Sequence, residues 1–589
     1  MAPTALEERT PGGVDPKSKV EAAADESLRR RLTAAQSRFV ESHPKSKEQH
    51  EIAVSHLPGG NTRTLLHTSP FPLTMKCGKG PFVWDEDGHK YLDLVGELSA
   101  GIYGHSHPVI REAMVSTFDN VGLNLGSTTS QEHKYAALIC ERFDLERVRF
   151  ANSGTEANMH AFNAARVFTG KNKIAVFCGA YHGAVFSFGN GKVASNAVNR
   201  EDWVIGKYNN VESAKAVIEE TPGLAAVIVE AMQGAGGGIS GTEEFLFQIQ
   251  ESAKKVGAVF ILDEVMTSRL APHGLQGVLG LKPDLVTMGK YLGGGFAFGV
   301  FGGREDIMAV YDPRSARAVA HSGTFNNNTM TMHVGHAGLS KILTPEVITS
   351  FNAKGDKYRQ RLQEVTKGTK CSVTGRGALW AVHFSDTGLR DIRSVEDVSE
   401  RHDLHDLFWF EMLEEGYWIH RRGSIALILD TPDEELDRFV GSSDFAKPPI
   451  TEYVPSVPRP GKTYKIHLKG TDKVVTITEG EVVVQSPAEA QPGGGWFWVC
   501  VERGNWLGFR NHVSGSLLGH NGKSGLHAKA TQQKAHESFC VRHHPDGGYV
   551  LLVKYPRGEE LRQVGCAPWD RKTLVEKDKD GARWMFEEV

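Results

Sequence analysis

Short apolar runs alternate with amphipathic stretches between about residue 60 and residue 440. Five of these runs have the length and composition of buried strands: VRFANSG (148–154), KIAVFCG (173–179), AAVIVEAMQG (225–234), AVFILDEV (258–265) and DLVTMGK (284–290). Each run stops at a glycine or a polar residue, and helix-like sequence follows it. Continuous apolar runs are typical of strands that are buried on both faces of a mostly parallel sheet. We therefore expect an α/β fold with its ligand at the strand ends.

The flanking segments have a different character. Residues 1–50 predict a polar tail followed by a helix, because the pattern from Glu26 to Ser55 is compatible with a helix. The stretch 51–445 contains the alternating pattern. Five prolines among the fifteen residues 447–461 predict a stiff, extended linker at about 446–461.

Residues 462–589 predict an all-β domain. Short strand-like runs separated by Gly or Asp turns recur there, as in TYKIHL (463–468), EVVVQ (481–485) and FCVRH (539–543). A weak repeat ends in FWVCV (497–501), SFCV (538–541) and MFEEV (585–589). Three such units of four strands would close a threefold barrel, and the segment resembles a β-trefoil of the fascin-like or lectin-like kind.

Composition and charge exclude several classes. Lys plus Arg is 67 and Asp plus Glu is 71, so the formal net charge of −4 gives no global basic footprint for nucleic acid or an anionic membrane surface. No apolar run reaches the roughly 18 residues of a bilayer span. The first residues are acidic and lack an apolar core, so neither a secretory signal nor a transit peptide is expected. Seven cysteines without CxxC spacing favour a cytoplasmic protein and no structural metal site.

Two motifs offer an anion cradle and a buried acid. In FANSGTEAN (150–158), Ser153, Gly154 and Thr155 stand where a strand turns into a helix, and such helix N-termini bind anions; alone, the same residues also suit an ordinary helix cap. In AVFILDEVMT (258–267), Asp263 ends a buried strand, where an ionised acid needs a cationic partner. A pyridinium nitrogen is one such partner, although a cap or a salt bridge is the alternative.

Two further motifs offer a nucleophile and an aromatic ring. Lys290 lies between a strand and three glycines in LVTMGKYLGGGFAFG (285–299), and a partly desolvated lysine can form a Schiff base. In GAYHGAVF (179–186), Tyr181 could stack on a flat cofactor and His182 could position a neighbour. A surface lysine and a core aromatic residue are the alternatives for each motif alone.

The order of these four motifs resembles that of the class III aminotransferases, which are fold-type I pyridoxal-phosphate enzymes, over roughly residues 50–445. NSGTEAN, DEVMTSR, GKYLGGG and GHSHP are similar to the branch that contains glutamate-1-semialdehyde aminomutase and the β-amino-acid, or β-phenylalanine-type, aminotransferases. The resemblance implies a large domain over about 110–340, with a small α+β domain from the flanking segments, and pyridoxal 5′-phosphate as the cofactor.

The resemblance also implies a role for each residue. Lys290 would bind the cofactor covalently and shuttle a proton, and Asp263 would keep the ring nitrogen protonated. Val265 and Tyr181 would pack on the two faces of the ring. The phosphate would be bound by Ser153, Gly154 and Thr155, together with Gly323 and Thr324 of the partner subunit in a homodimer. The remaining cofactor contacts would come from His182, Glu230 and Gln233.

Arginines indicate the substrate class. Arg63, in PGGNTRTLLH, and Arg421 or Arg422, in GYWIHRRGSIAL, stand where β-amino-acid aminotransferases hold carboxylates, and bidentate pairing suits that purpose. Arg421 and Arg422 are read as neighbours on a strand, which point to opposite faces, so only one of them should face the pocket. Two departures accompany this: Ala297 replaces a proline that often follows the glycines, and the acidic gating residue of the aminomutase has no counterpart in 416–427.

We therefore expect transfer of an amino group from an amino acid or amine, most simply a β-amino acid, to an α-keto acid. An intramolecular aminomutase is the alternative, and a non-enzymatic binding protein is a third reading that the intact Lys290 motif opposes. A carbohydrate or protein ligand of the tail stays open, with Trp496, Trp498, Trp506 and Trp569 as candidate stacking residues. HHPDGG (543–548) lacks a third metal ligand nearby.

Overall fold

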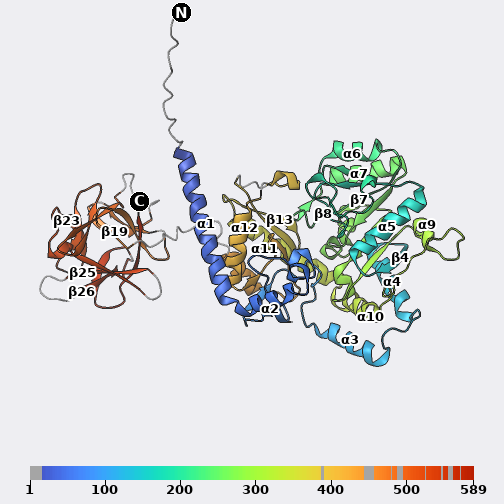
Figure 1. Ribbon diagram of the computed structural model, residues 1–589, viewed down its shortest axis with the longest axis horizontal. Coiled ribbons are helices and arrows are strands. Elements are labelled where there is room, and N and C mark those ends of the chain that lie inside the picture. Colours follow the sequence, from blue (N-terminus) through green and yellow to red (C-terminus); the bar gives the residue numbers. More distant parts are fainter. Residues whose placement is uncertain are drawn as a thin grey trace, which may run out of the picture. The chain divides into compact units, whose positions relative to one another are not determined.

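In the structure, a computed structural model, the described residues are 16–386, 391–398, 400–442, 457–471, 473–478, 480–486, 495–523, 525–544, 548–554, 561–570 and 572–588 (Figure 1). They fall into two units, Met1–Ala446 and Lys447–Val589. Residues 1–15 of the expected tail and 446–456 of the expected linker lie outside the described residues.

A seven-stranded sheet forms the centre of the first unit. All five apolar runs named above are strands of it, so this part of the sequence pattern predicts the fold correctly. Its order is β4 (Arg147–Ala151), β12 (Gly299–Gly303), β11 (Leu285–Gly289), β10 (Val259–Asp263), β7 (Leu224–Val229), β5 (Lys173–Phe177) and β6 (Trp203–Gly206). β12 pairs antiparallel with β4 and β11, and the other pairs are parallel. The sheet is therefore mostly parallel, as expected.

Both faces of this sheet are buried, which explains why its strands read as continuous apolar runs. Val259 and Ile261 of β10 pack with α5 (Gly154–Thr169), whereas Phe260 and Leu262 pack with α6 (Val211–Glu219) and α7 (Glu243–Val256). Figure 1 shows these helices on the sheet. Alternate side chains of one strand thus belong to two different cores, and packing on both faces fixes the position of the strand backbone.

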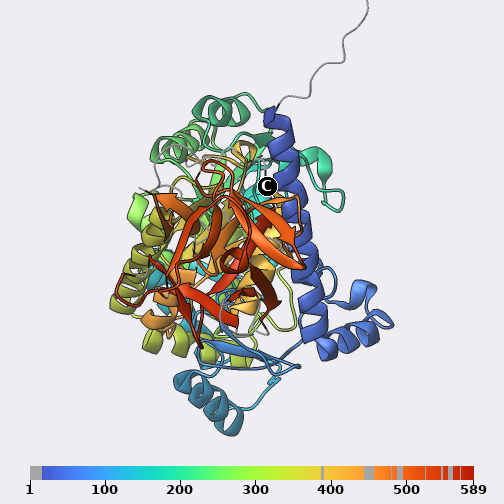
Figure 2. The same cartoon turned by 90° about the vertical axis from the view of Figure 1, so that its left-hand side faces the viewer.

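The N-terminal helix is longer than expected and is broken in two. α1 (Pro16–Ser42) and α2 (Pro44–Val54) meet at His43, whose φ of −124° and ψ of 52° are not helical. A residue that precedes proline is sterically disfavoured in the helical region, so Pro44 ends α1 and begins α2. Figure 2 shows the length of α1, which packs on α12 (His402–Glu414) through the buried Phe39.

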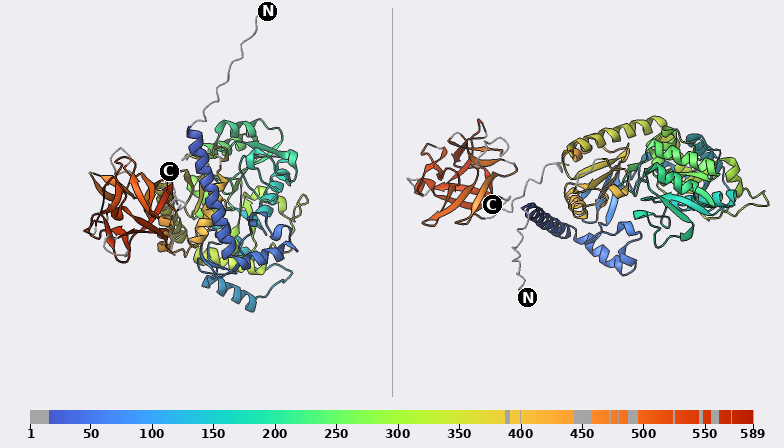
Figure 3. Two further views of the ribbon diagram at one scale, coloured as in Figure 1. Left: turned by 60° about the vertical axis from the view of Figure 1, so that its left-hand side comes forward. Right: turned by 90° about the horizontal axis from the view of Figure 1, so that it is seen from above.

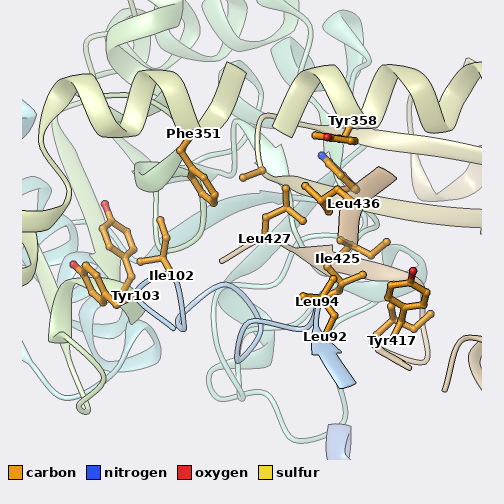
Figure 4. Close-up of a cluster of buried hydrophobic side chains, with 14 of the residues drawn as sticks. Leu92, Leu94, Ile102, Tyr103, Phe351, Tyr358, Tyr417, Ile425, Leu427 and Leu436 are labelled. Carbon is orange, nitrogen blue, oxygen red and sulfur yellow. The ribbon is translucent and has the colours of Figure 1, made fainter. Parts of the chain in front are cut away.

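Two small sheets and a long helix complete the first unit. The first sheet contains β1 (Met75–Lys79), β2 (Phe82–Asp85), β3 (Lys90–Asp93) and β15 (Tyr417–Trp418); the second contains β13 (Cys371–Arg376), β14 (Leu379–Phe384) and β16 (Ser424–Ala426). α11 (Pro345–Val365) covers the second sheet (Figure 3). Figure 4 shows Phe351 and Tyr358 of α11 pointing toward Leu427 and Leu436, in a core that contains residues from both small sheets.

The remaining helices and strands of this unit lie outside these three sheets. They are α3 (Pro108–Asn120), α4 (Ser130–Phe143), α8 (Gly274–Leu279), α9 (Glu305–Met308), α10 (Thr329–Ala337), α13 (Asp433–Ser442), which packs on α11, and the short pair β8 (Met232–Gln233) and β9 (Ile239–Ser240). Among the described residues, no helix has both the length and the apolar character that crossing a membrane requires.

The second unit is all-β, as its turn-rich pattern predicts. Six of its strands close a ring in which each pairs with the next: β17 (Thr463–Leu468), β20 (Trp498–Arg503), β21 (Trp506–Asn511), β24 (Phe539–His543), β25 (Tyr549–Lys554) and β28 (Arg583–Glu588), which pairs with β17 again. Three hairpins lie between consecutive ring strands: β18–β19 (Val474–Thr478 and Glu481–Gln485), β22–β23 (Leu517–His520 and Leu526–Ala530) and β26–β27 (Leu561–Cys566 and Leu574–Lys577). The three repeat endings seen in the sequence fall in β20, β24 and β28.

The tryptophans of this unit divide by exposure. Trp498 is fully buried and donates its indole N–H to the Val475 carbonyl at 2.8 Å. Trp496 and Trp506 are half-buried, and Lys554 lies over the Trp506 ring. Of the four candidate stacking residues, Trp569 alone is largely exposed, at 74%.

Candidate active site

The carboxyl ends of the central strands bring the predicted motifs to one edge of the sheet. Ala151, at the end of β4, pairs with Gly299, which in turn pairs with Gly289 at the end of β11. This register places the turn that starts α5 beside Lys290, which follows β11 directly. Residues that lie far apart in the sequence are therefore neighbours because the strands end together.

The Asp263 carboxylate is buried, with 4% of the residue exposed, and it accepts hydrogen bonds from several segments. Its Oδ2 lies 2.8 Å from His182 Nδ1 and accepts from Asn158 Nδ2 at 2.9 Å, and its Oδ1 accepts from the Val265 N–H at 3.0 Å. Asn158 Oδ1 accepts in turn from the Thr287 hydroxyl at 2.6 Å. Asn158 and Thr287 are site residues that the sequence analysis did not single out.

The turn that begins α5 packs closely against Val265, two residues after Asp263. Ser153 caps the helix, because its hydroxyl accepts from the Glu156 N–H at 3.2 Å. A Cβ at Gly154 would stand 2.9 Å from a methyl group of Val265, so only glycine allows the turn to approach this closely. The Thr155 hydroxyl accepts from the Ala184 N–H at 3.2 Å. The structure thus joins the predicted anion cradle to the Tyr181–His182 loop and to Val265.

Glu230 anchors the same loop from the other side. One of its carboxylate oxygens accepts from the Tyr181 N–H at 3.0 Å and the other from the Gly234 N–H at 2.9 Å. Burial raises the pKa of the Glu230 carboxyl to about 7. Gln233 is fully buried and donates to the Cys178 carbonyl at 2.8 Å.

Lys290 is held in an unusual backbone conformation beside this group of residues. Its φ is +54°, in the left-handed region that a residue other than glycine seldom adopts. Its Nζ donates to the Ser99 hydroxyl at 3.1 Å. Burial lowers the pKa of the Lys290 ammonium to about 8; the nearby carboxylates of Asp263 and Glu230 oppose that shift, whereas the Arg269 guanidinium adds to it. The amine is therefore neutral in a large fraction of molecules near pH 8.

Several features of the site fit a bound group that has an anionic end and a flat ring. His182 Nε2 and Gln233 Oε1 are buried polar atoms for which the described residues supply no hydrogen-bond partner. Tyr181 is 42% exposed as a residue, although its main chain is anchored within the site. The N-terminus of the sixteen-residue α5 adds backbone N–H groups and the positive end of a helix dipole.

The predicted substrate arginines are in different environments. Arg63 pairs with Glu97 at 2.9 Å, and Glu97 lies two residues from Ser99. Arg421 is engaged elsewhere: it donates to Asp406 and to the Ser69 carbonyl at 2.6 Å each, and it stacks on Trp409.

Arg422 is exposed, and no ion pair of its guanidinium is found among the described residues. The expectation that Arg421 and Arg422 lie on a strand is wrong. They stand in a turn between β15 and β16, which the Gly423 N–H closes on the His420 carbonyl at 2.8 Å. Gly423 has a φ of +77° there, a conformation that glycine adopts without strain, and strand alternation therefore does not select between the two arginines.

Gly323 and Thr324 lie on a separate loop. Thr324 lines a cavity of about 370 Å³ whose other lining residues are 124–128, 325 and 327–329. Leu125 and Phe325 at this cavity are 50% and 55% exposed.

A second polar cluster lies outside the strand ends and was not predicted. His43, Asp85 and His89 bring their ligand atoms within 4.8 Å of one another. They are already hydrogen-bonded: the His89 ring and the Tyr91 hydroxyl both donate to the Asp85 carboxylate at 2.9 Å. Of the HHPDGG turn, residues 545–547 lie outside the described residues.

The fold and the site together define an enzyme with an activated lysine and a buried acid at the ends of parallel strands. The chain belongs to the class III aminotransferases: the model of the family "Aminotransferase class-III" matches residues 66–432. It is accordingly a pyridoxal-phosphate-dependent aminotransferase, as the motifs predict, and a solved "Transaminase with PLP bound" covers 69% of this chain at 29% identity with a TM-score of 0.63.

Among characterised relatives, the beta-phenylalanine transaminase of Variovorax paradoxus is 45% identical over 70% of this chain and 94% of its own length. The crystal structure of a beta-phenylalanine aminotransferase from the same organism has a TM-score of 0.69, covering 71% of this chain and 97% of that one. A glutamate-1-semialdehyde 2,1-aminomutase of Lachnoclostridium phytofermentans is less similar, at 36% identity over 64% of this chain and 92% of its own length.

We predict that Lys290 is the most reactive buried amine of the chain. In the cofactor-free protein, labelling by an amine-selective reagent should reach half its maximal rate near pH 8, because the amine loses its proton there, whereas an ordinary lysine has a pKa of about 10.4. Mass spectrometry of the Lys290 peptide measures the rate, and the peptide of the exposed Lys282 is followed in the same samples. A Lys290 labelling rate that rises only above about pH 10 would contradict the site geometry.

Proposed function

We propose that the chain transfers an amino group from a β-amino acid to an α-keto acid. The observation that carries this proposal is the Arg63–Glu97 ion pair, which lies two residues from the hydroxyl that contacts Lys290. A guanidinium that pairs with a carboxylate in the resting protein can exchange it for the carboxylate of a substrate. The 45% identity to a beta-phenylalanine transaminase supports the same substrate class.

In this proposal, residues from several segments of the site would contact the cofactor. The bound pyridoxal phosphate supplies an electron sink for the bonds at the substrate carbon. Lys290 would hold the cofactor covalently and would carry a proton when its amine is free. Asp263, oriented by His182 and Asn158, would hold a proton on the ring nitrogen.

The ring and the phosphate are held by different residues. The Tyr181 ring and Val265 would cover the two faces of the ring, and Ser153, Gly154 and Thr155 would bind the phosphate at the N-terminus of α5. Glu230 and Gln233 would position the Tyr181 loop beside the ring oxygen.

Arg422 is our choice for the second carboxylate-binding residue. Arg421 already pairs with Asp406 and stacks on aromatic rings, so its guanidinium is committed to the fold. Arg422 follows it in the same turn, its side chain is exposed, and its main-chain N–H donates to His420 Nδ1 at 3.2 Å. In the transfer cycle, Arg63 would bind one carboxylate and Arg422 the other.

We also propose a homodimer in which Thr324, with Gly323, completes the phosphate site of the partner. Apolar side chains gather on α3 and the loop after it: Val115, Phe118, Leu123 and Leu125 are 45%, 63%, 43% and 50% exposed. Contiguous exposed apolar surface marks an interface. A second copy of this chain is the proposed occupant, because the same surface borders the cavity that Thr324 lines.

For the second unit we propose a β-trefoil, because a closed six-stranded ring with three intervening hairpins is the arrangement expected of that fold. The domain boundaries proposed from the sequence are 1–50, 51–445, 446–461 and 462–589. The exposed Trp569 is the best-placed residue for a carbohydrate or protein ligand. A cytoplasmic location is supported by seven cysteines that are all free.

A panel of amino donors tests the reaction. We expect β-phenylalanine, with 2-oxoglutarate or pyruvate as acceptor, to discharge the visible absorbance of the lysine-bound cofactor and to yield the aminated acceptor. α-Phenylalanine, which differs in the position of its amino group, is the matched control and should react more slowly. An isomer of the donor formed without any acceptor would instead establish the aminomutase alternative. If none of the donors changed the absorbance spectrum, the proposed amino-group transfer would be refuted.

Arginine variants test the substrate contacts. We expect Arg63→Met and Arg422→Met to lower kcat/KM by about 10- to 100-fold each, since a charge-assisted hydrogen bond contributes about 1.5–3 kcal/mol. Steady-state kinetics with donor and acceptor varied separately assigns each arginine to one half-reaction. Arg421→Met is the control, and it should lower thermal stability with a smaller effect on KM. A larger kinetic effect from Arg421→Met would reverse our choice.

A charged residue in the apolar surface tests the homodimer. Phe118→Arg should shift the mass in sedimentation from dimer to monomer and weaken cofactor binding, because Thr324 of each subunit then no longer reaches the partner. Val278→Arg, on α8 and 52% exposed before substitution, is the control and should stay dimeric. A wild-type chain that sediments as a monomer at micromolar concentration would refute the dimer.

A further inference from the structure

A turn of left-handed backbone lies against Lys290. Gly96, Glu97, Leu98 and Ser99 have φ values of +50°, +46°, +54° and +78° in succession. Only the first is a glycine, and three consecutive side-chain-bearing residues in this region are disfavoured because each Cβ crowds the following carbonyl. Such a conformation persists only where its surroundings hold it, and it tends to occur at functional sites.

Asp93 holds the start of this turn. Its Oδ1 accepts from the N–H groups of Val95 and Gly96 at 2.8 and 2.9 Å, and its Oδ2 lies 3.0 Å from His105 Nε2. The Gly101 N–H closes the turn on the Gly96 carbonyl at 2.8 Å.

Arg269 holds the end of the turn. It is fully buried, and it donates to the Ser99 carbonyl at 2.8 Å and to the Leu427 carbonyl at 2.6 Å. None of the ion pairs between described residues includes Arg269, and its Nε has no hydrogen-bond partner there. The Arg269 guanidinium also lies over the Phe351 ring, 5.7 Å from its centroid, but a buried cation without a carboxylate partner is costly. An apolar side chain of the same length would be buried there at a lower cost in free energy. The charge of Arg269 therefore indicates a functional role.

The contacts of Arg269 converge on the lysine. The residue whose carbonyl it binds, Ser99, is 2% exposed and accepts from Lys290 Nζ through its hydroxyl at 3.1 Å. Leu427, the other acceptor, follows β16 of the small sheet, and Asn352 of α11 donates to the Arg269 carbonyl at 3.0 Å. The guanidinium therefore links the strained turn to the elements that carry the small sheet.

We infer that Arg269 is a positioning residue for the reaction: it holds Ser99 in the left-handed turn, so that the Ser99 hydroxyl lies against Lys290 Nζ. The guanidinium charge, which no carboxylate of the described residues balances, also opposes a second positive charge nearby. This inference rests on the proposed role of Lys290. The charged groups that act on the lysine are Asp263 and Glu230, which favour its protonated form, and Arg269, which opposes it. Tyr103 and Tyr291 are the titratable groups that act on Arg269 itself.

Three variants of the full chain separate the two parts of this role. Arg269→Met removes the charge and both hydrogen bonds, Arg269→Lys keeps the charge but cannot reach both carbonyls, and Ser99→Ala removes the acceptor of Lys290. Arg142→Met is the matched control, because Arg142 also donates to two main-chain carbonyls, those of Leu339 and Leu343, without acting on Lys290.

The measurement is the rate at which added pyridoxal phosphate attaches to Lys290 of the cofactor-free chain, from about pH 6 to about pH 10. Borohydride reduction and the mass of the Lys290 peptide report it, so the readout does not depend on turnover. Arg269→Met should move the midpoint of the profile to higher pH, which slows attachment at neutral pH by about tenfold for each unit of the shift. Arg269→Lys and Ser99→Ala should keep a midpoint at or below that of the wild type and attach the cofactor about five- to tenfold more slowly. Arg142→Met should match the wild type.

A wild-type profile and rate in Arg269→Met would overturn the inference, even if its melting temperature changed. Should Arg269→Met fail to fold, wild-type rates in both Arg269→Lys and Ser99→Ala would overturn it instead. Failure of the proposed function looks different, because the wild-type chain itself would then not attach the cofactor at Lys290.

Discussion

The arrangement of the site depends on the burial of one carboxylate, that of Asp263. Its charge stands at the end of a strand that is covered on both faces, so it must be compensated by donors within hydrogen-bond distance. The donors come from α5, from the loop of His182 and from the turn of Val265. The need to satisfy a single group thus brings these segments to one point, and the Thr287–Asn158 hydrogen bond adds β11 to them. Hydrogen bonds to Asp263 hold the loops at the strand ends in place, whereas apolar packing holds the strands beneath them.

Buried charge at this site is divided between the two signs. Asp263 and Glu230 are carboxylates with several N–H donors each, whereas Lys290 and Arg269 are cations that contact a hydroxyl and carbonyl groups. Neither cation has a carboxylate within ion-pair distance among the described residues. Pyridoxal phosphate carries an anionic phosphate and a ring nitrogen that can be protonated, so a bound cofactor would bring charges of both signs to a site that already holds both.

Sequence patterns predict the parts of this molecule that are set by local periodicity. The five apolar runs are strands, because a strand that is covered on both faces has apolar residues at nearly every position. Asp263 and Lys290 are candidate site residues because they end such runs. The left-handed turn at Ser99 and the bond from Arg269 could not be predicted in this way. They join positions 170 residues apart, and nothing in GELSAG or DEVMTSR states which carbonyl a guanidinium will meet. The turn that contains Arg421 and Arg422 is set by a single main-chain hydrogen bond, from the Gly423 N–H to the His420 carbonyl, and the hydrophobic pattern does not record that bond.

The ring of the second unit is closed by the pairing of its first strand with its last. Tyr464 stands opposite Glu588, and Leu468 stands opposite Trp584, so the contacts that complete the barrel join the most distant residues of the unit. Contacts of such long sequence separation form late, because the entropy of closing the intervening chain opposes them. During synthesis, β17 must wait for β28 with one edge unpaired, and an unpaired strand edge is open to other chains. The interval between the synthesis of β17 and that of β28 therefore adds to the time for which this unit is open to aggregation.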